Sequence, residues 1–372
     1  MVDNYGDLGV CWRLARQLAG EHGHGVRLWV DDLGSFSRLL PELDSRLDQQ
    51  QCRGVNIRHW RKPFPEVEPG DVVIEAFACE LPENFVLAMA RRDPPPSWLN
   101  LEYLSAEDWV AGCHGLPSPH PRLPLVKHFF FPGFAAGTGG LLREDGLLAR
   151  RAAFQSDPAA MASYWSRLGL PPRRADELRL SLFSYANVAT LDLLAAWQRS
   201  PSRVTGLVPE GTAVAVLAGA EFGFSPEAGG HIHRGNLAIY VLPFLEQDDY
   251  DRLLWACDLN FVRGEDSFVR AQWAARPFVW HIYPQQDDAH HAKLNAFLDL
   301  YCADLAPQAA GAVRRLWHGW NGMGATGDIG AGWKTFVEYL PALQAHGLHW
   351  VEHLAKWGDL AGNLEKFIAT RL

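Results

Sequence analysis

The chain has 372 residues, of which 48% are hydrophobic and 21% are charged, and its 34 basic against 43 acidic residues give a net charge of −9. This length exceeds what one hydrophobic core usually serves, so we expect two domains. The acidic balance disfavours binding to a phosphate backbone, and no uncharged apolar stretch has the roughly 20 residues of a membrane helix. We therefore expect neither a nucleic-acid partner nor a membrane partner.

Cysteines and the first residues indicate the compartment. Residues 1–7 lack the basic start and the apolar run of a signal peptide. The six cysteines lie far apart and form no C-x-x-C pair: Cys11, Cys52, Cys79, Cys113, Cys257 and Cys302. Such scattered cysteines are typical of reduced residues in an intracellular protein. We therefore expect a cytoplasmic protein without structural disulfides or a zinc site.

Hydrophobic periodicity in the N-terminal part alternates between helical and strand patterns. Helices are predicted at residues 8–20, 35–40 and 84–92, and strands at residues 26–30, 55–58, 71–77 and 98–103. This alternation predicts a parallel α/β sheet. A proline-rich irregular segment from Gly112 to Gly140 follows, and a segment of that length is usually functional.

A helix at residues 152–168 and the pair Pro171-Pro172 mark a domain boundary, after which the alternation restarts. Strands are predicted at residues 178–185, 213–217, 237–242, 259–262 and 278–282, and helices at residues 188–198, 248–256, 267–274, 288–300 and 334–372, the last with a break at Pro341. We expect an N-terminal domain of residues 1–172, completed by a helix of residues 350–372, and a C-terminal domain of residues 173–349. Ligands of such folds bind beyond strand carboxyl ends and between domains, which favours an enzyme acting on a nucleotide-like ligand.

The segment from Asp3 to Gly9 is the first candidate site, a turn ahead of the first predicted helix. Gly6 and Gly9 let the backbone approach a ligand closely, and a helix N-terminus attracts anions. Asp3 and Asp7, four residues apart, are equally suited to hold a cation or accept a proton. Capping of the helix by Asp7 explains the pattern as well, and spacing does not decide between these interpretations.

A second candidate is the segment Phe261–Phe268, which reads as a strand, a glycine turn and a helix start. Asp266 and Ser267 at that helix start are suited to bind a diphosphate, and Glu265 beside them to bind a sugar hydroxyl. Capping alone explains Asp266 or Ser267, but not the whole sequence Arg263-Gly264-Glu265, so we favour a functional site.

Three further strand ends combine aromatic and polar residues that suit a nucleobase. They are the segments 181–185, 242–247 and 281–285. A metal site is a weaker hypothesis. His281, His290 and His291 with Asp287 and Asp288 offer ligands, but we expect one of the two aspartates to cap the following helix instead.

Four segments resemble motifs of the EarP family, the protein-arginine rhamnosyltransferases of bacterial elongation factor P: residues 2–18, 28–32, 129–134 and 261–268. The resemblance covers essentially the whole chain, and its first and last motifs are highly specific. It implies an inverting glycosyltransferase of GT-B architecture, α/β with two Rossmann-like domains facing a central cleft. Such an enzyme moves L-rhamnose from dTDP-β-L-rhamnose to a guanidinium nitrogen of one loop arginine of elongation factor P.

The resemblance also assigns roles to residues of this chain. Asp7 would be the general base, Asp3 would help to hold the acceptor arginine, and Glu265 would be a second essential carboxylate. The residues expected to bind the donor are Asn4, Tyr5, Gly6, Phe183, Tyr185, Phe244, Gln247, Arg263, Asp266, Ser267 and Tyr283. No metal or other cofactor is expected.

Two alternatives remain open at this stage. Generic features fit a GT-B enzyme with another sugar nucleotide or acceptor, and a non-catalytic protein that clamps a nucleotide, although the three carboxylates disfavour the latter. The resemblance further implies an apolar strand before Asp3 that supports the Asp3–Asp7 segment. We therefore expect that the N-terminal domain lacks its first strand here, through truncation or a mis-assigned start.

Overall fold

The computed structural model describes residues 4–211, 217, 227–323 and 329–370. They form two compact units, which we call the first unit (residues 1–145 and 353–372) and the second unit (residues 146–352). The C-terminal residues thus group with the N-terminal part of the chain. This division differs from the boundary expected at residue 172, because residues 146–172 group with the second unit.

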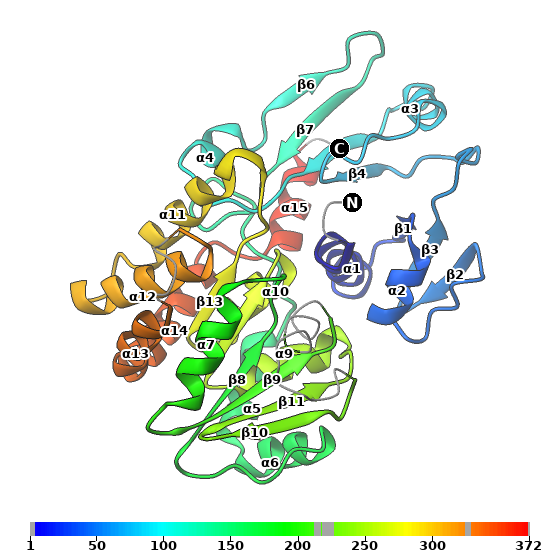
Figure 1. The fold of residues 1–372 in the computed structure, drawn as a ribbon. Helices are drawn as coiled ribbons and strands as arrows, with labels where there is room; N and C mark the ends of the chain where they lie inside the picture. The colour runs from blue at the N-terminus through cyan, green and yellow to red at the C-terminus, as the bar shows by residue number, and fades with distance from the viewer. Residues whose placement is uncertain (1–3, 212–216, 218–226, 324–328, 371–372) are drawn as a thin grey trace. The chain divides into compact units, whose positions relative to one another are not determined.

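The second unit contains one six-stranded sheet in the order β10-β11-β9-β8-β12-β13 (Figure 1). Its strands are β8 (Glu177–Leu182), β9 (Arg203–Pro209), β10 (His231–Arg234), β11 (Leu237–Leu242), β12 (Leu259–Arg263) and β13 (Phe278–His281). All neighbours pair in parallel except β10 with β11. Central parallel strands are covered on both faces, which explains why the first four residues of β12 are all buried.

Helices of the second unit surround this sheet. They are α5 (Leu147–Ser156), α6 (Pro158–Arg167), α7 (Ala189–Gln198), α9 (Gln247–Ala256), α10 (Asp266–Trp273), the short 3-10 helix η1 (Gln286–Asp288), α11 (Ala289–Tyr301), α12 (Pro307–Trp320), α13 (Ile329–Glu338) and most of α14 (Leu340–Ala355). Tyr164 and Leu170 pack in one buried cluster with Leu207 and Leu253. This packing explains why residues 146–172 belong to the second unit.

Some elements of the second unit differ from the sequence-based predictions. The helix predicted at residues 152–168 is two helices, because the Asp157 side chain caps α6 and Pro158 occupies its first position. Helix α12 was not predicted. The strand predicted at residues 213–217 lies outside the described residues apart from Leu217, and the strand between β8 and β11 is instead β9.

The first unit contains two sheets, in the orders β1-β3-β2 and β4-β5-β7-β6. The strands are β1 (Arg27–Val30), β2 (Gln49–Cys52), β3 (Val55–His59), β4 (Val72–Ala76), β5 (Ser97–Leu101), β6 (Pro117–Pro119) and β7 (Val126–Phe130), and the helices are α1 (Asn4–Gly20), α2 (Leu33–Leu39), α3 (Glu83–Ala90), α4 (Trp109–Cys113) and α15 (Leu360–Ala369). β2 and β6 are antiparallel to their neighbours, and the other pairs are parallel. The segment predicted as irregular, residues 112–140, therefore contains two strands.

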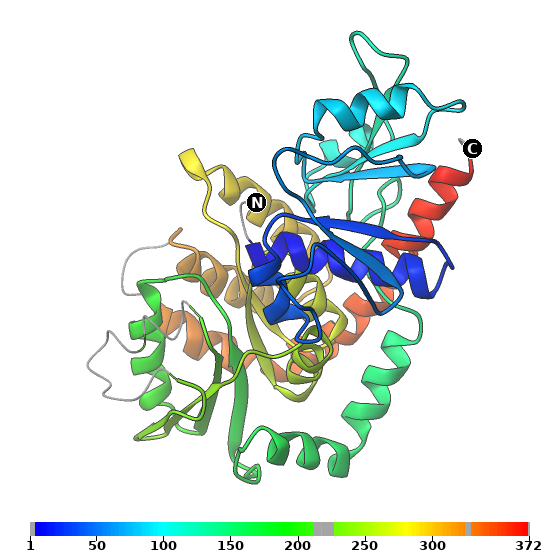
Figure 2. The ribbon, with the colours of Figure 1, turned by 90° about the vertical axis from the view of Figure 1, so that its right-hand side faces the viewer.

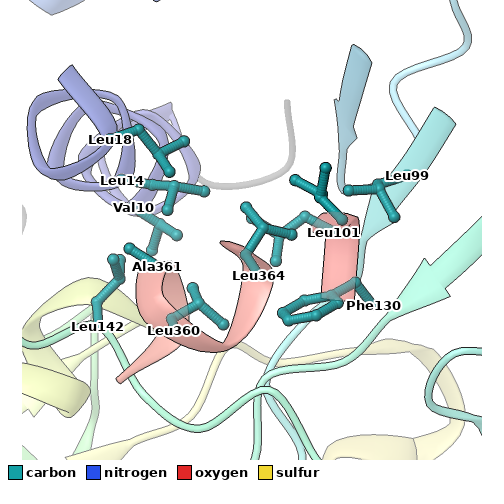
Figure 3. Close-up of a cluster of buried hydrophobic side chains, with 11 residues drawn as sticks. Val10, Leu14, Leu18, Leu99, Leu101, Phe130, Leu142, Leu360, Ala361 and Leu364 are labelled. Carbon is teal, nitrogen blue, oxygen red and sulfur yellow. The ribbon is translucent and has the colours of Figure 1, made fainter. Parts of the chain in front are cut away.

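The C-terminal helix α15, red in Figure 1 and Figure 2, completes the core of the first unit. Figure 3 shows Leu364 of α15 among side chains of α1, β5 and β7, including Leu14, Leu99 and Phe130. Each fully buried leucine contributes on the order of 2 kcal/mol. The Asp359 side chain caps α15 by accepting from the Gly362 N–H at 2.9 Å.

The tail of the chain is helical, but its breaks differ from the prediction. α13 ends at Glu338, and Pro341 lies in the first turn of α14, where a missing N–H costs nothing. The break before α15 falls at Gly358, whose φ of +77° is a left-handed conformation that glycine adopts readily.

All six cysteines are free thiols in the structure. Cys52, Cys257 and Cys302 are buried, whereas Cys79 is exposed. Among the described residues, no helix is both long enough and apolar enough to cross a membrane.

Candidate active site

The candidate site residues of the second unit lie at the carboxyl ends of its parallel strands. β8 and β12 are neighbours in the sheet, whereas the chain passes from β8 to β9 on the opposite side of β8. The strand order therefore reverses between β8 and β12, the kind of position where open α/β sheets bind ligands. The predicted residues follow these strand ends: Phe183 and Tyr185 after β8, Phe244 and Gln247 after β11, Arg263 to Ser267 at and after β12, and Tyr283 after β13.

Arg263 is held by aromatic rings at this switch point. Its guanidinium carbon lies 4.4 Å from the centre of the Phe183 ring and 4.8 Å from the centre of the Tyr185 ring. Its Nη1 donates to the Ser184 carbonyl at 3.4 Å. Cation–π contacts of this kind contribute about 0.5–2 kcal/mol each, so the rings fix the orientation of a permanent positive charge.

Tyr283 joins this aromatic group from the neighbouring strand. Its ring centre lies 5.4 Å from that of Tyr185, and the two planes are nearly perpendicular. The side chain of Asn321 holds the loop that carries it. Asn321 accepts from the Ile282 N–H at 3.0 Å and donates to the Trp280 carbonyl at 2.8 Å. Phe183, Tyr185, Arg263 and Tyr283 are thus brought together, as their common strand-end position predicts.

The turn between β12 and α10 organises the acidic residues. Gly264 has a φ of +62°, and its carbonyl accepts from Trp280 Nε1 at 2.8 Å. The Arg263 N–H donates to Ser267 Oγ at 3.1 Å, and this hydroxyl in turn donates to the Arg263 carbonyl. Ser267 therefore stabilises the turn through the backbone of Arg263.

Two carboxylates flank the start of α10. Gln247 Nε2 donates to Asp266 Oδ2 at 3.4 Å, which links the first residues of α9 and α10. Glu265 is the N-cap residue of α10, but its side chain makes no capping hydrogen bond. Phe244 is half-buried on the loop that leads to α9.

His281 is a buried group at the end of β13, which the sequence analysis considered as a metal ligand and as part of the strand-end segment 281–285. It is 6% exposed, its ring centre lies 5.3 Å from that of Tyr185, and its Nδ1 has no hydrogen-bond partner among the described residues. Burial, together with the positive charge of Arg263 and the neighbouring His290, lowers the pKa of His281 to about 4. The ring is therefore neutral at pH 7.

The histidines considered as metal ligands are only partly brought together. Ligand atoms of Asp288, His290 and His291 lie within 4.8 Å of one another. However, His290 Nδ1 accepts from the Gln285 N–H at 3.1 Å, so the neutral ring carries its proton on Nε2. A metal at Nε2 would have to displace that proton and break this bond. The expected cap is also absent, since Asp288 occupies the N-cap position of α11 without a side-chain capping bond.

In the first unit, Asp7 lies inside the first turns of α1 rather than on a preceding turn. Asn4, Tyr5 and Gly6 are helical as well. The carboxylate of Asp7 is buried, 6% exposed, and its Oδ2 accepts from the Tyr103 hydroxyl at 3.3 Å. The Tyr5 hydroxyl accepts from Arg38 Nη1 at 3.2 Å. Asp3 lies outside the described residues.

Together, parallel sheets in both units and a positively charged aromatic site at a switch point are the features of an α/β enzyme that binds a nucleotide-linked substrate. Comparison with known proteins defines the class as glycosyltransferase. Residues 1–369 match the family described as the elongation factor P (EF-P) rhamnosyltransferase EarP. The chain belongs to the EarP family.

Individual relatives agree with this membership. A protein-arginine rhamnosyltransferase of Pseudomonas putida is 50% identical over 375 residues, covering 100% of this chain and 97% of that protein. One of Pseudomonas aeruginosa is 49% identical over 372 residues, covering 99% and 97%. A solved structure from work on EarP-mediated arginine glycosylation of translation elongation factor EF-P matches with a TM-score of 0.69 at 36% identity, covering 100% of this chain and 97% of that one. The predicted family and the predicted α/β fold class are confirmed.

Proposed function

We propose that this chain transfers L-rhamnose from dTDP-β-L-rhamnose, with inversion, to a guanidinium nitrogen of a loop arginine of elongation factor P. The observation that carries the proposal is the full-length similarity to protein-arginine rhamnosyltransferases. Elongation factor P as acceptor follows from the description of the family. The donor and the stereochemistry follow from the motif resemblance.

The donor would be held by the second unit. The aromatic rings of Tyr185 and Tyr283 offer faces on which a thymine base can stack, and Arg263 supplies a fixed positive charge for the diphosphate. The N-terminus of α10 beside it adds N–H groups that favour an anion. These groups would also stabilise the departing dTDP, whose negative charge grows as the bond to the sugar breaks.

The acceptor chemistry would belong to Asp7. A guanidinium has a pKa of about 13.8 and a carboxylate about 4, so proton transfer before attack would cost roughly 13 kcal/mol at about 1.4 kcal/mol per unit. Asp7 is therefore better suited to orient the guanidinium and to accept its proton while the bond forms. The attacking nitrogen bonds to the anomeric carbon, the bond from that carbon to the diphosphate oxygen breaks, and dTDP leaves with the electron pair. Asp3 would assist in holding the guanidinium, and Glu265 would be a second essential carboxylate.

No metal is required in this proposal, because Arg263 and the start of α10 supply the positive charge that a leaving diphosphate needs. Treatment with EDTA should leave the rate of transfer unchanged. A strong loss of rate that Mg²⁺ restores would contradict this part of the proposal.

The proposal is tested by incubating purified elongation factor P with this protein and dTDP-β-L-rhamnose and measuring the mass of the product. We expect a gain of one deoxyhexose, located on one arginine by fragmentation. A gain only with another sugar nucleotide, or no modification despite tight donor binding, would contradict the proposed donor or the proposed catalysis.

A further inference from the structure

Tyr103 contacts the proposed base, and nothing in the sequence patterns indicated it. This residue follows β5 in the first unit, and its hydroxyl donates to Oδ2 of Asp7 at 3.3 Å. Its ring is half-buried. A hydrogen bond to one carboxylate oxygen restricts the rotation of the whole carboxylate, and it is stronger than a bond between neutral groups.

The ring of Tyr103 is itself supported by Phe77, which directly follows β4. The two rings are stacked, with centres 4.5 Å apart and planes inclined by 17°. The Phe77 N–H donates to the Leu101 carbonyl at 2.7 Å, which extends the pairing of β4 with β5 by one residue. The stack is therefore anchored at the carboxyl ends of two paired strands.

Phe77 reaches this position through a strained backbone. Its φ is +56° and that of Ala78 is +51°, in the left-handed region that residues with a Cβ rarely adopt. The turn persists because the buried Asn100 side chain accepts from the Ala78 N–H at 3.1 Å. Strain maintained by a dedicated buried partner is characteristic of functional sites, where surrounding structure over-determines an unfavourable conformation.

We propose that the Phe77–Tyr103 pair positions the Asp7 carboxylate for the acceptor guanidinium, with Tyr103 as a positioning residue and Phe77 as its support. This inference rests on the proposed function of Asp7. Transfer to a guanidinium requires the carboxylate to meet one N–H in a defined geometry, because misplacement by about 1 Å reduces rates strongly. A carboxylate whose rotation is fixed in advance meets that requirement, and the donor, held by other residues, is unaffected.

The test compares kcat and the donor KM in variants of the full-length protein, with elongation factor P as acceptor. Tyr103→Phe removes the hydroxyl and keeps the ring, so folding is preserved. We expect kcat to fall about 10- to 100-fold, the range for one hydrogen bond to a charged group, with the donor KM unchanged within about twofold. The matched control is Tyr164→Phe, which removes a hydroxyl that donates to the Asp249 carbonyl in the second unit and should leave kcat unchanged.

A double-variant cycle separates positioning from simple structural support. Phe77→Leu should lower kcat by a smaller factor in the same direction, and the double variant should resemble Tyr103→Phe alone, because both changes act on Asp7 through one hydroxyl. Multiplicative effects, or a Tyr103→Phe protein with the wild-type kcat, would overturn the inference. Asp7→Asn is measured beside them. If Asp7→Asn is fully active, the proposed role of Asp7 fails, whereas an inactive Asp7→Asn with an unimpaired Tyr103→Phe refutes only the positioning role.

Discussion

The two candidate regions of the molecule hold their charged groups in different ways. In the second unit, the positive charge of Arg263 lies between two aromatic rings and is bonded to a backbone carbonyl. In the first unit, the side chain of Asp7 is buried and its Oδ2 accepts a hydrogen bond from Tyr103, whose ring stacks on a residue in a strained backbone conformation. In the proposed function this difference corresponds to a division of labour, in which the aromatic residues would serve donor binding and the oriented carboxylate would serve bond formation.

The two regions also differ in how strongly a small displacement of a side chain should affect function. A ring that stacks on a base tolerates small displacements, because stacking depends on area and has little directional preference. A carboxylate that accepts a proton during bond formation must meet one N–H at hydrogen-bond distance. We therefore expect changes in the second unit to affect mainly donor affinity and changes in the first unit to affect mainly turnover.

Glu265 gives the most stringent test of this difference between the two units. It lies in the second unit, yet the proposed function assigns it a role in catalysis. Glu265→Gln keeps the size and shape of the side chain, and the Glu265 side chain makes no capping bond to α10, so we expect the variant to fold. We expect transfer to fall by about 100- to 1,000-fold, on the order of 3–4 kcal/mol, as initial rates measured by mass spectrometry will show. The control Glu338→Gln changes an exposed glutamate at the end of α13 and should retain full activity. If Glu265→Gln retains activity but binds donor poorly, the second unit serves binding alone.

The pH dependence of the free energy of unfolding tests whether the His281 ring in the second unit is shielded from water, as its burial indicates. The folded-state pKa of His281 is about 4, below its ordinary value of 6.5. Because the unfolded chain takes up this proton at a higher pH, the folded state loses stability as pH falls from 6.5 towards 4. The loss should total about 3 kcal/mol, visible in urea unfolding at pH 7 and pH 4.5. His281→Phe should weaken this dependence, and an unchanged slope would show that His281 is hydrated in the folded state.

Substitution of Tyr185, also in the second unit, should have a smaller effect, and on donor affinity. Tyr185→Ala removes a stacking face and one ring that holds Arg263, so donor affinity measured by calorimetry should fall about 10- to 100-fold. At saturating donor, turnover should fall far less. Tyr339→Ala, outside the candidate site, is the control for loss of a tyrosine ring. Unchanged donor affinity in Tyr185→Ala would mean that the base is held elsewhere.

Much of the α/β fold and of the second unit's candidate site was predictable, because the ends of buried strands can be recognised in the sequence. The segment Leu259–Val262, apolar except for Asn260, and the following Gly264 predict a strand and a turn, which placed Arg263 beside residues after β8 and β13. Alternation of helices and strands likewise predicted two α/β units. The family motifs supplied the acidic residues that periodicity alone left ambiguous.

The remainder depends on tertiary contacts that no local pattern encodes. The bond from Tyr103 to Asp7 joins residues 96 positions apart, and the orphaned nitrogen of His281 is a consequence of packing. The short strand Pro117–Pro119 has no alternating pattern to find, and α12 begins at Pro307, a residue more often associated with a loop. The helical conformation of Asn4–Asp7 was missed because glycine and aspartate near a helix start also favour a turn.

The most direct measurement of the central claim follows donor binding and transfer together in Asp7→Asn. Calorimetry with dTDP-β-L-rhamnose should give the wild-type affinity within about twofold, because most of the proposed donor-binding residues lie in the second unit. Transfer to elongation factor P should fall by at least about 1,000-fold, on the order of 4 kcal/mol, because the amide cannot accept the proton. A variant that transfers rhamnose at the wild-type rate, or one that loses donor binding in proportion to its activity, would contradict the account.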